Sequence, residues 1–180
     1  MRTLTGFILK NLLKIPAFFC FIFLGLVLFP GCASKPPQPD QTARIYLESP
    51  DDGKQFNRPA RQIVMPITEN QYYVYSKPIL TEADIANIEL VKVDLGLCIR
   101  IDFSRRAGVV LQQTTVSNQG GRLFLLVDDK PVGVRLIDGP IVGGMLYMFL
   151  ELPEDQITDF VMNLRESCMK FQKERKAKGY

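Results

Sequence analysis

The chain has 180 residues, with 22 basic and 19 acidic side chains and no histidine. This length allows one ordinary domain with a hydrophobic core in addition to a leader segment. A sequence without histidine offers no imidazole for a zinc site, and it contains no recognisable catalytic motif.

The first 32 residues have the layout of a leader for export. An apolar run over residues 15–29 follows three basic side chains, those of Arg2, Lys10 and Lys14, with no acidic residue among them. This order, with a small residue before a cut, is typical of a secretory signal peptide. The stretch Leu28-Phe29-Pro30-Gly31-Cys32 resembles the bacterial lipobox, in which the cysteine thiol receives diacylglycerol before cleavage. We therefore expect residues 1–31 to be a lipoprotein signal peptide and Cys32 to be lipid-modified, with palmitate among its acyl groups.

An uncleaved membrane helix is the alternative for this segment. At about 1.5 Å per residue the apolar run reaches only about 22 Å, which is short of a hydrocarbon core of about 30 Å. A longer helix starting at Phe7 would contain Lys10, Lys14 and Pro16, and proline kinks a helix. A lipid-anchored protein that faces the periplasm is therefore favoured, and Ala33 in place of Asp favours the outer membrane.

Residues 32–41 are predicted to be a Pro-rich tether, and residues 42–180 a single domain. Three prolines in the tether favour extended polyproline II. Residues 32–169 contain 14 basic and 18 acidic side chains, whereas residues 170–178 contain five basic and one acidic. We interpret this basic tail as a solvated helix end, with contact to anionic headgroups or another envelope polymer as the alternative. The acidic body and the exported location argue against a nucleic-acid partner.

The first half of the domain is predicted to contain mainly strands. Strands are expected over residues 43–48, 63–68 and 72–75, with Pro66 favouring an edge position for the second. In the third strand, alternation places Tyr73 and Tyr75 on one face, so this pair is a candidate binding surface, with core packing as the alternative. Thr81 followed by Asp84 resembles a capping box and predicts a short helix. A strand over residues 90–93 follows it.

The second half alternates helices with strands. After a strand at residues 97–103, Ser104 is expected to cap a helix ending near Ser117, with Ala107, Val110, Leu111 and Thr114 on its buried side. Strands over residues 122–127, 132–137 and 145–152 come next, and Pro153 opens the last helix. The buried side of that helix is expected to contain Ile157, Phe160, Val161, Leu164, Cys168 and Phe171. We expect Phe160→Ala to destabilise the domain more than truncation after Lys170.

These elements predict an α+β fold: a mostly antiparallel sheet of six or seven strands, with the two longer helices packed on one face. Cys98 lies on the face of its strand opposite Leu97 and Ile99, and Cys168 lies on the apolar side of the last helix. The two thiols are thus expected on opposite sides of the sheet. A disulfide between them is disfavoured but left open.

The order of motifs over residues 78–165 resembles the head subdomain in the first periplasmic domain of SecD. Residues 77–85 resemble its "P-x-L-T-x-x-D-I" segment, and Ile99–Ser104 stands where that family has a strand followed by "L-T-x-x-G". Residues 122–132 resemble "R-L-A-I-V-L-D-G-K-V", and residues 138–144 resemble "N-E-P-I-x-G-G". The resemblance implies a head-subdomain fold that contacts translocating polypeptide. The resemblance does not imply proton-coupled translocation for this chain, because that activity of SecD requires its six membrane helices.

The other candidate residues favour structural roles. Asp128 and Asp129 suit a hairpin turn better than a metal or acid–base pair, and Ser104 suits a helix cap better than a nucleophile. We therefore name no catalytic or metal-binding residue and expect no cofactor. The favoured function is a non-enzymatic module that binds an envelope protein or an extended polypeptide, for which sheet edges suit β-augmentation. An envelope enzyme with an unrecognised site and an accessory factor in protein export are the alternatives.

Overall fold

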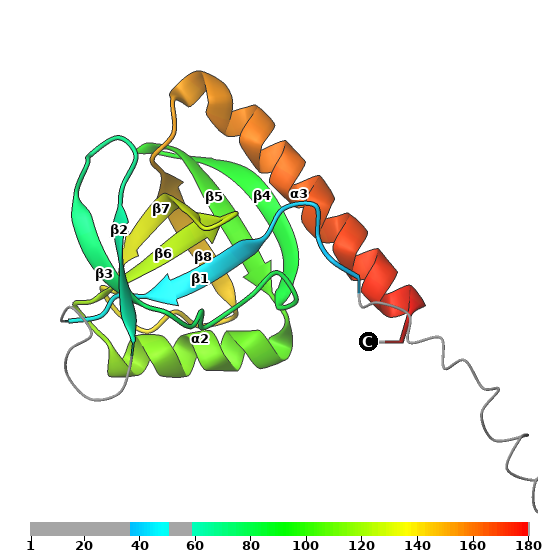
Figure 1. Cartoon of the computed structure of the whole chain (residues 1–180), viewed down its shortest axis with the longest axis horizontal. Coiled ribbons are helices and arrows are strands. Elements are labelled where there is room, and N and C mark those ends of the chain that lie inside the picture. Colours follow the sequence, from blue (N-terminus) through cyan, green and yellow to red (C-terminus); the bar gives the residue numbers. More distant parts are fainter. Residues whose placement is uncertain (1–36, 51–58, 180) are drawn as a thin grey trace, which may run out of the picture. The chain divides into compact units, whose positions relative to one another are not determined.

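The computed structural model describes residues 37–50 and 59–179 (Figure 1). The expected signal peptide, Cys32 and half of the expected tether lie outside the described residues. Within the described part of the chain, no helix is both long enough and apolar enough to cross a bilayer.

An antiparallel sheet of six strands dominates the structure, and a two-stranded sheet and two helices accompany it. The six-stranded sheet has the order β1-β6-β7-β8-β5-β4. Its strands are β1 (Ala43–Leu47), β4 (Ile85–Val93), β5 (Gly96–Phe103), β6 (Arg122–Val127), β7 (Lys130–Leu136) and β8 (Met145–Leu150). The smaller sheet pairs β2 (Ala60–Val64) with β3 (Gln71–Tyr75), and the helices are α2 (Arg105–Ser117) and α3 (Glu154–Ala177). The predicted α+β class is confirmed.

The main core lies on one face of the six-stranded sheet. Alternate residues of the strands, such as Ile45, Ile99 and Leu125, form one buried cluster with Leu111 of α2 and Leu164 of α3. The two helices therefore cover the same face, as predicted. In Figure 1 the sheet curls around this core, with α2 across one end and α3 along its side.

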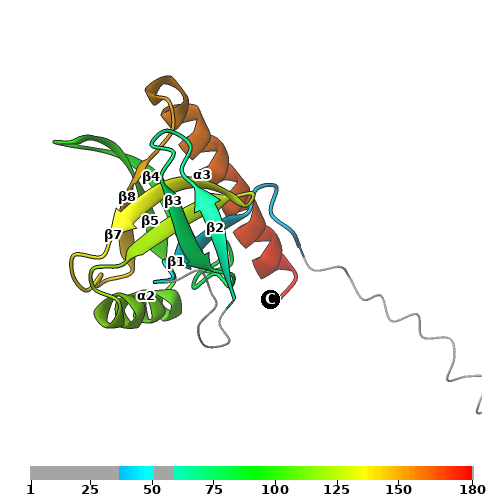
Figure 2. The same cartoon turned by 60° about the vertical axis from the view of Figure 1, so that its left-hand side comes forward.

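A second, smaller core lies on the outer face of the same sheet. The β2–β3 hairpin packs Ile63, Met65 and Val74 against Tyr46 and Phe124 (Figure 2). This hairpin covers only part of the outer face, because the cluster beneath it comes from β1 and β6, with Val134 of β7 at its margin. The outer side of β8 does not belong to this cluster.

The predicted helix after Thr81 is wrong. The expected bond forms, because the Thr81 backbone N–H donates to Asp84 Oδ2 at 2.9 Å, but it closes a single turn before β4 begins at Ile85. Pairing with β5 along nearly the whole of β4, and burial of Ile85 and Ile88, outweigh the local helix signal. The predicted strand over residues 90–93 is therefore only the last part of a nine-residue strand.

Helix α2 begins as predicted but presents a different side to the core. Ser104 Oγ accepts a hydrogen bond from the Ala107 N–H, and the buried residues are Ala107, Gly108, Leu111 and Thr115. Val110 is exposed, because the helix is turned so that Gly108 faces the Gly143-Gly144 turn. A Cβ at Gly108 would lie 3.0 Å from the Gly144 Cα, so this close approach requires glycine.

Helix α3 follows Pro153 as predicted, and five of the six expected residues are buried. Phe160 is the exception, since it is only partly buried. The tail is not simply a solvated end. Gln172 Nε2 donates to the carbonyls of Glu82, Ala83 and Ile85, and Arg175 donates to the Ala83 carbonyl at 2.9 Å. These contacts fasten the end of α3 to the turn that precedes β4.

Candidate functional site

The carboxylates singled out in the sequence have structural partners. Asp128 and Asp129 have φ values of 49° and 63°, as a two-residue hairpin turn of type I′ requires. The Thr42 N–H donates to Asp128 Oδ1 at 2.8 Å, and Arg61 pairs with Asp129 at 3.1 Å. Among the described residues, no three acidic, cysteine or histidine side chains gather where they could hold a metal ion. Turn formation and ion pairing thus account for both aspartates.

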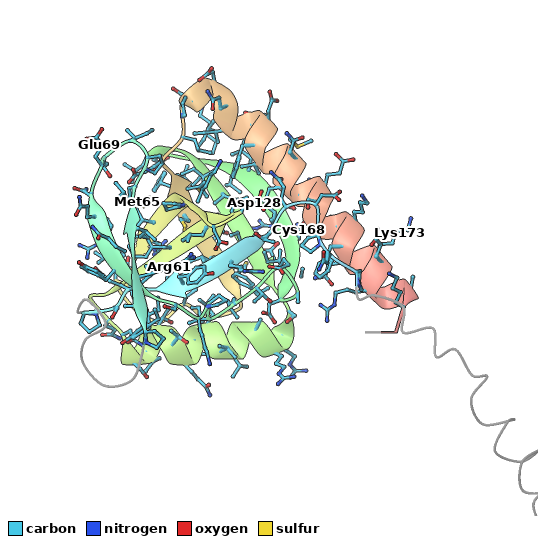
Figure 3. All side chains as sticks on the ribbon, in the orientation of Figure 1. Arg61, Met65, Glu69, Asp128, Cys168 and Lys173 are labelled. Atoms are coloured by element: carbon cyan, nitrogen blue, oxygen red, sulfur yellow. The ribbon has the colours of Figure 1, made fainter. Side chains whose placement is uncertain are left out.

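The two described thiols are free and buried. Burial raises the pKa of the Cys168 thiol to about 12, and burial also raises the pKa of Cys98. Cys168 points from α3 into the core (Figure 3). Because the thiolate is the reactive species, neither cysteine is set up as a nucleophile near neutral pH.

The tyrosine pair lies on the side of β3 that faces away from the smaller core. Tyr72 and Val74 belong to that core, and the Tyr72 ring lies 5.0 Å from the Phe124 ring. Tyr73 is exposed, whereas Tyr75 is half-buried and lines a cleft of about 530 Å³ with Leu47, Ile79 and Asn118. The predicted alternation is therefore confirmed. The two rings differ in exposure, and whether they bind a partner stays a prediction.

That cleft does not have the character of an active site. Lys77 and Tyr75 are the ionisable residues among its described lining side chains, which otherwise come from apolar residues, proline, Thr114 and Asn118. The Asn118 amide already donates to the Thr114 carbonyl at 2.8 Å. No carboxylate, cysteine or histidine stands among its described lining residues, so the cleft suits packing or binding better than acid–base chemistry.

The edge strands of the two sheets differ in how far other residues pair with or cover them. At β1, the Ile45 N–H donates to the Leu80 carbonyl at 2.9 Å, and the Ile79 N–H donates to the Ile45 carbonyl at 2.8 Å. The start of β4 is covered by Gln172 and Arg175 of α3. On β2, by contrast, the edge away from β3 has no strand partner in the described part of the chain. This edge is short, and Gln62 and Val64 on it are exposed.

The outer side of β8 is an exposed row of large apolar side chains. Met145, Tyr147 and Phe149 alternate with the buried residues of the strand and are 44%, 37% and 43% exposed. Val142 in the preceding loop is 60% exposed and lines a cleft of about 360 Å³ together with Met145 and Tyr147. We refer to Val142, Met145, Tyr147 and Phe149 as the β8 surface.

Charged groups border the β8 surface on two sides. Arg135 and Asp138 line the same cleft and pair at 3.1 Å, and the hydrogen bond from Arg135 lowers the pKa of Asp138. On β5, Arg100 stands opposite Tyr147 and pairs with Glu89 at 2.8 Å and Asp102 at 3.1 Å. An apolar centre with an ionic rim is the usual composition of a protein-binding surface.

The sequence interpretation missed the β8 surface, although a signal was present. Residues 145–150, Met-Leu-Tyr-Met-Phe-Leu, are apolar at every position, whereas a strand with one covered face alternates apolar and polar residues. A strand that is apolar on both faces needs either a second cover or a binding partner. The hairpin that could have covered it lies over β1 and β6 instead.

No protein-family model matches the sequence, and no curated protein matches it significantly. The fold is shared with solved structures of SecDF. The crystal structure of SecDF in super-membrane-facing form matches with a TM-score of 0.52 and 17% identity, over 71% of this chain and 19% of that one. A structure of "a membrane component SecDF that enhances protein export" matches with a TM-score of 0.50 and 15% identity, over 72% of this chain and 63% of that one.

The match spans less than two thirds of either SecDF chain. At these identities the similarity shows the fold alone. It supports the resemblance to a SecD domain that the order of sequence motifs indicated.

Proposed function

We propose that the protein is a lipid-anchored, periplasm-facing module that binds polypeptide without catalysing a reaction, and that the β8 surface is its binding surface. The observation that carries the proposal is the set of exposed apolar side chains on β8, which no described part of the chain covers. Aromatic residues and methionine are enriched in the centres of protein interfaces, where each contributes a large buried area. Tyr73 and the free edge of β2 form a second, smaller candidate surface suited to β-augmentation.

The shared fold supports a partner connected with protein export. One matching protein is described as a membrane component that enhances protein export. An accessory factor in export is therefore the specific form of the proposal that we favour. An envelope enzyme is the less favoured alternative, because neither the Tyr75 cleft nor the cleft at the β8 surface is lined by a described cysteine, serine or histidine.

Replacement of both aromatic residues on β8 should weaken polypeptide binding. In Tyr147→Ser/Phe149→Ser we expect the Kd for an unfolded probe, reduced and carboxymethylated lactalbumin, to rise about 30- to 700-fold, because truncating each central aromatic costs about 1–2 kcal/mol. Fluorescence anisotropy of the labelled probe measures the Kd. Val109→Ser/Val116→Ser on α2 removes two side chains of similar exposure and should leave it unchanged.

Equal Kd values for the two double variants would contradict the assignment of β8. Thermal unfolding of each variant checks that the fold is intact before binding is compared. If the probe does not bind the native protein at all, photocrosslinking in cells tests the β8 surface instead, with a photoreactive phenylalanine analogue at position 149 or, as the control, at position 116. Crosslinks to polypeptide at position 149 and not at position 116 would support the β8 surface, and the same pattern at both positions would refute it.

Cys32→Ser should block processing at the leader. The variant should accumulate as a precursor about 3 kDa larger than the mature protein, because the thiol is the group that receives lipid before cleavage. Electrophoresis of membrane fractions and mass spectrometry of the mature N-terminus measure the difference. If the variant and the native protein migrate together, the lipid anchor is refuted and an uncleaved membrane segment takes its place.

A further inference from the structure

The end of α3 concentrates the basic residues of a chain that is otherwise mildly acidic. Residues 170–178 contain five basic side chains and one acidic, against 14 basic and 18 acidic over residues 32–169. Arg175 is bound to the Ala83 carbonyl, and Lys170 pairs with Asp40. Lys173 and Lys176 are exposed, and Lys173 points away from the sheet (Figure 3). The helix thus presents positive charge to its surroundings at this end.

Asp40 and Gln41, which precede β1, lie beside this same basic end. The Lys170 ammonium group donates to Asp40 Oδ2 at 2.8 Å, and the Gln41 N–H donates to Ser167 Oγ at 2.8 Å. In Figure 1 the first described residues run alongside the C-terminal half of α3. An anchor upstream of residue 37 would therefore join the domain beside the basic end of α3.

The length of the connecting segment limits how far that end can be from a membrane. Asp40 is eight residue steps after Cys32, and a fully extended chain of eight steps spans at most about 28 Å. The β8 surface lies on the outer face of the sheet, opposite the core face that α3 covers.

We propose that the basic end of α3 rests on a surface of anionic phospholipid headgroups, while the β8 surface, on the face of the sheet opposite α3, stays open to a polypeptide. Clustered lysines next to an anchor are attracted to anionic lipid, so the basic end adds an electrostatic contact beside the point of attachment. The acidic remainder of the domain is repelled by the same surface. This inference rests on the proposed membrane attachment, but an uncleaved apolar segment would place the membrane at the same end.

Residue-resolved lysine acetylation tests the contact. The full chain is reconstituted into vesicles of phosphatidylcholine alone, or of equal parts phosphatidylcholine and phosphatidylglycerol, and treated with a membrane-impermeant acetylating ester. We expect Lys173 and Lys176 to react about fivefold more slowly in the anionic vesicles, the factor that corresponds to about 1 kcal/mol for a lysine near such a surface. Lys92, at the far end of β4, should react equally in both. High salt should abolish the difference.

Charge variants separate a specific contact from a general effect of lipid. In Lys173→Glu/Lys176→Glu the slower acetylation of Lys170 in anionic vesicles should disappear. In Arg105→Glu/Arg106→Glu, which changes net charge equally at exposed positions on α2, it should persist. Equal acetylation rates at Lys173 and Lys176 in both vesicle types would overturn the inference. These two lysines would then be solvated rather than in contact with lipid. Equal slowing at Lys92 would also overturn it. Protection that persists in Cys32→Ser supports the contact even if acylation fails.

Discussion

Removal of residues 171–180 is expected to lower the free energy of unfolding by about 3–6 kcal/mol, a large part of the 5–15 kcal/mol typical of a domain. The truncation removes the buried Phe171 ring, worth about 1.5–3 kcal/mol. It also removes the hydrogen bonds from Gln172 and Arg175 to the turn at residues 82–85, each worth about 0.5–1.5 kcal/mol. Urea unfolding followed by circular dichroism measures the change.

A shorter truncation provides the control. Removal of residues 178–180 leaves Phe171, Gln172 and Arg175 in place and should change the free energy of unfolding by less than about 0.5 kcal/mol. If the two truncations are equally harmless, the contacts between α3 and the turn before β4 contribute nothing in solution. The sequence alone led to the opposite expectation, because Phe171 was the only residue of the tail on the apolar side of the helix.

Leu164→Ala is expected to destabilise the domain by about 3–5 kcal/mol, more than Phe160→Ala one turn earlier. Leu164 is fully buried in the main core, so its truncation leaves a cavity as well as losing apolar burial. Phe160 packs against that core but is only partly buried, so Phe160→Ala should cost about 1.5–3 kcal/mol. Met162→Ala on the exposed side of the same helix should cost less than about 0.5 kcal/mol.

Chemical unfolding of these three variants gives the order directly. A Phe160 variant less stable than the Leu164 variant would mean that α3 is rotated relative to the structure. The expectation from the sequence placed Phe160 among the central residues, because hydrophobic periodicity cannot tell the middle of a buried side from its margin.

Local chemistry was sufficient for much of the fold. Period-two alternation located β5, a continuous apolar run located β6, Ser104 located the start of α2, and Pro153 with the apolar repeat located α3. The paired aspartates at 128 and 129 identified a hairpin turn, and the structure confirms it. Each of these signals depends on residues within one turn or one strand, where backbone geometry and side-chain direction follow from the residues themselves.

The tertiary structure decided what depends on partners distant in the chain. Thr81 and Asp84 make the local bond of a helix start, yet pairing with β5 turns the following residues into a strand. Close approach to Gly144 sets which side of α2 is buried.

The same holds for both proposed contact surfaces. The sequence by itself determined an α+β class and a SecD-like order of elements, and it predicts an export leader. It could not determine which face of the sheet stays uncovered, nor that the basic end of α3 lies beside the start of the described chain. Such features arise only when segments distant in the chain pack together, by 126 residues for Gln41 and Ser167, and the free energy of that packing is not encoded in any one segment.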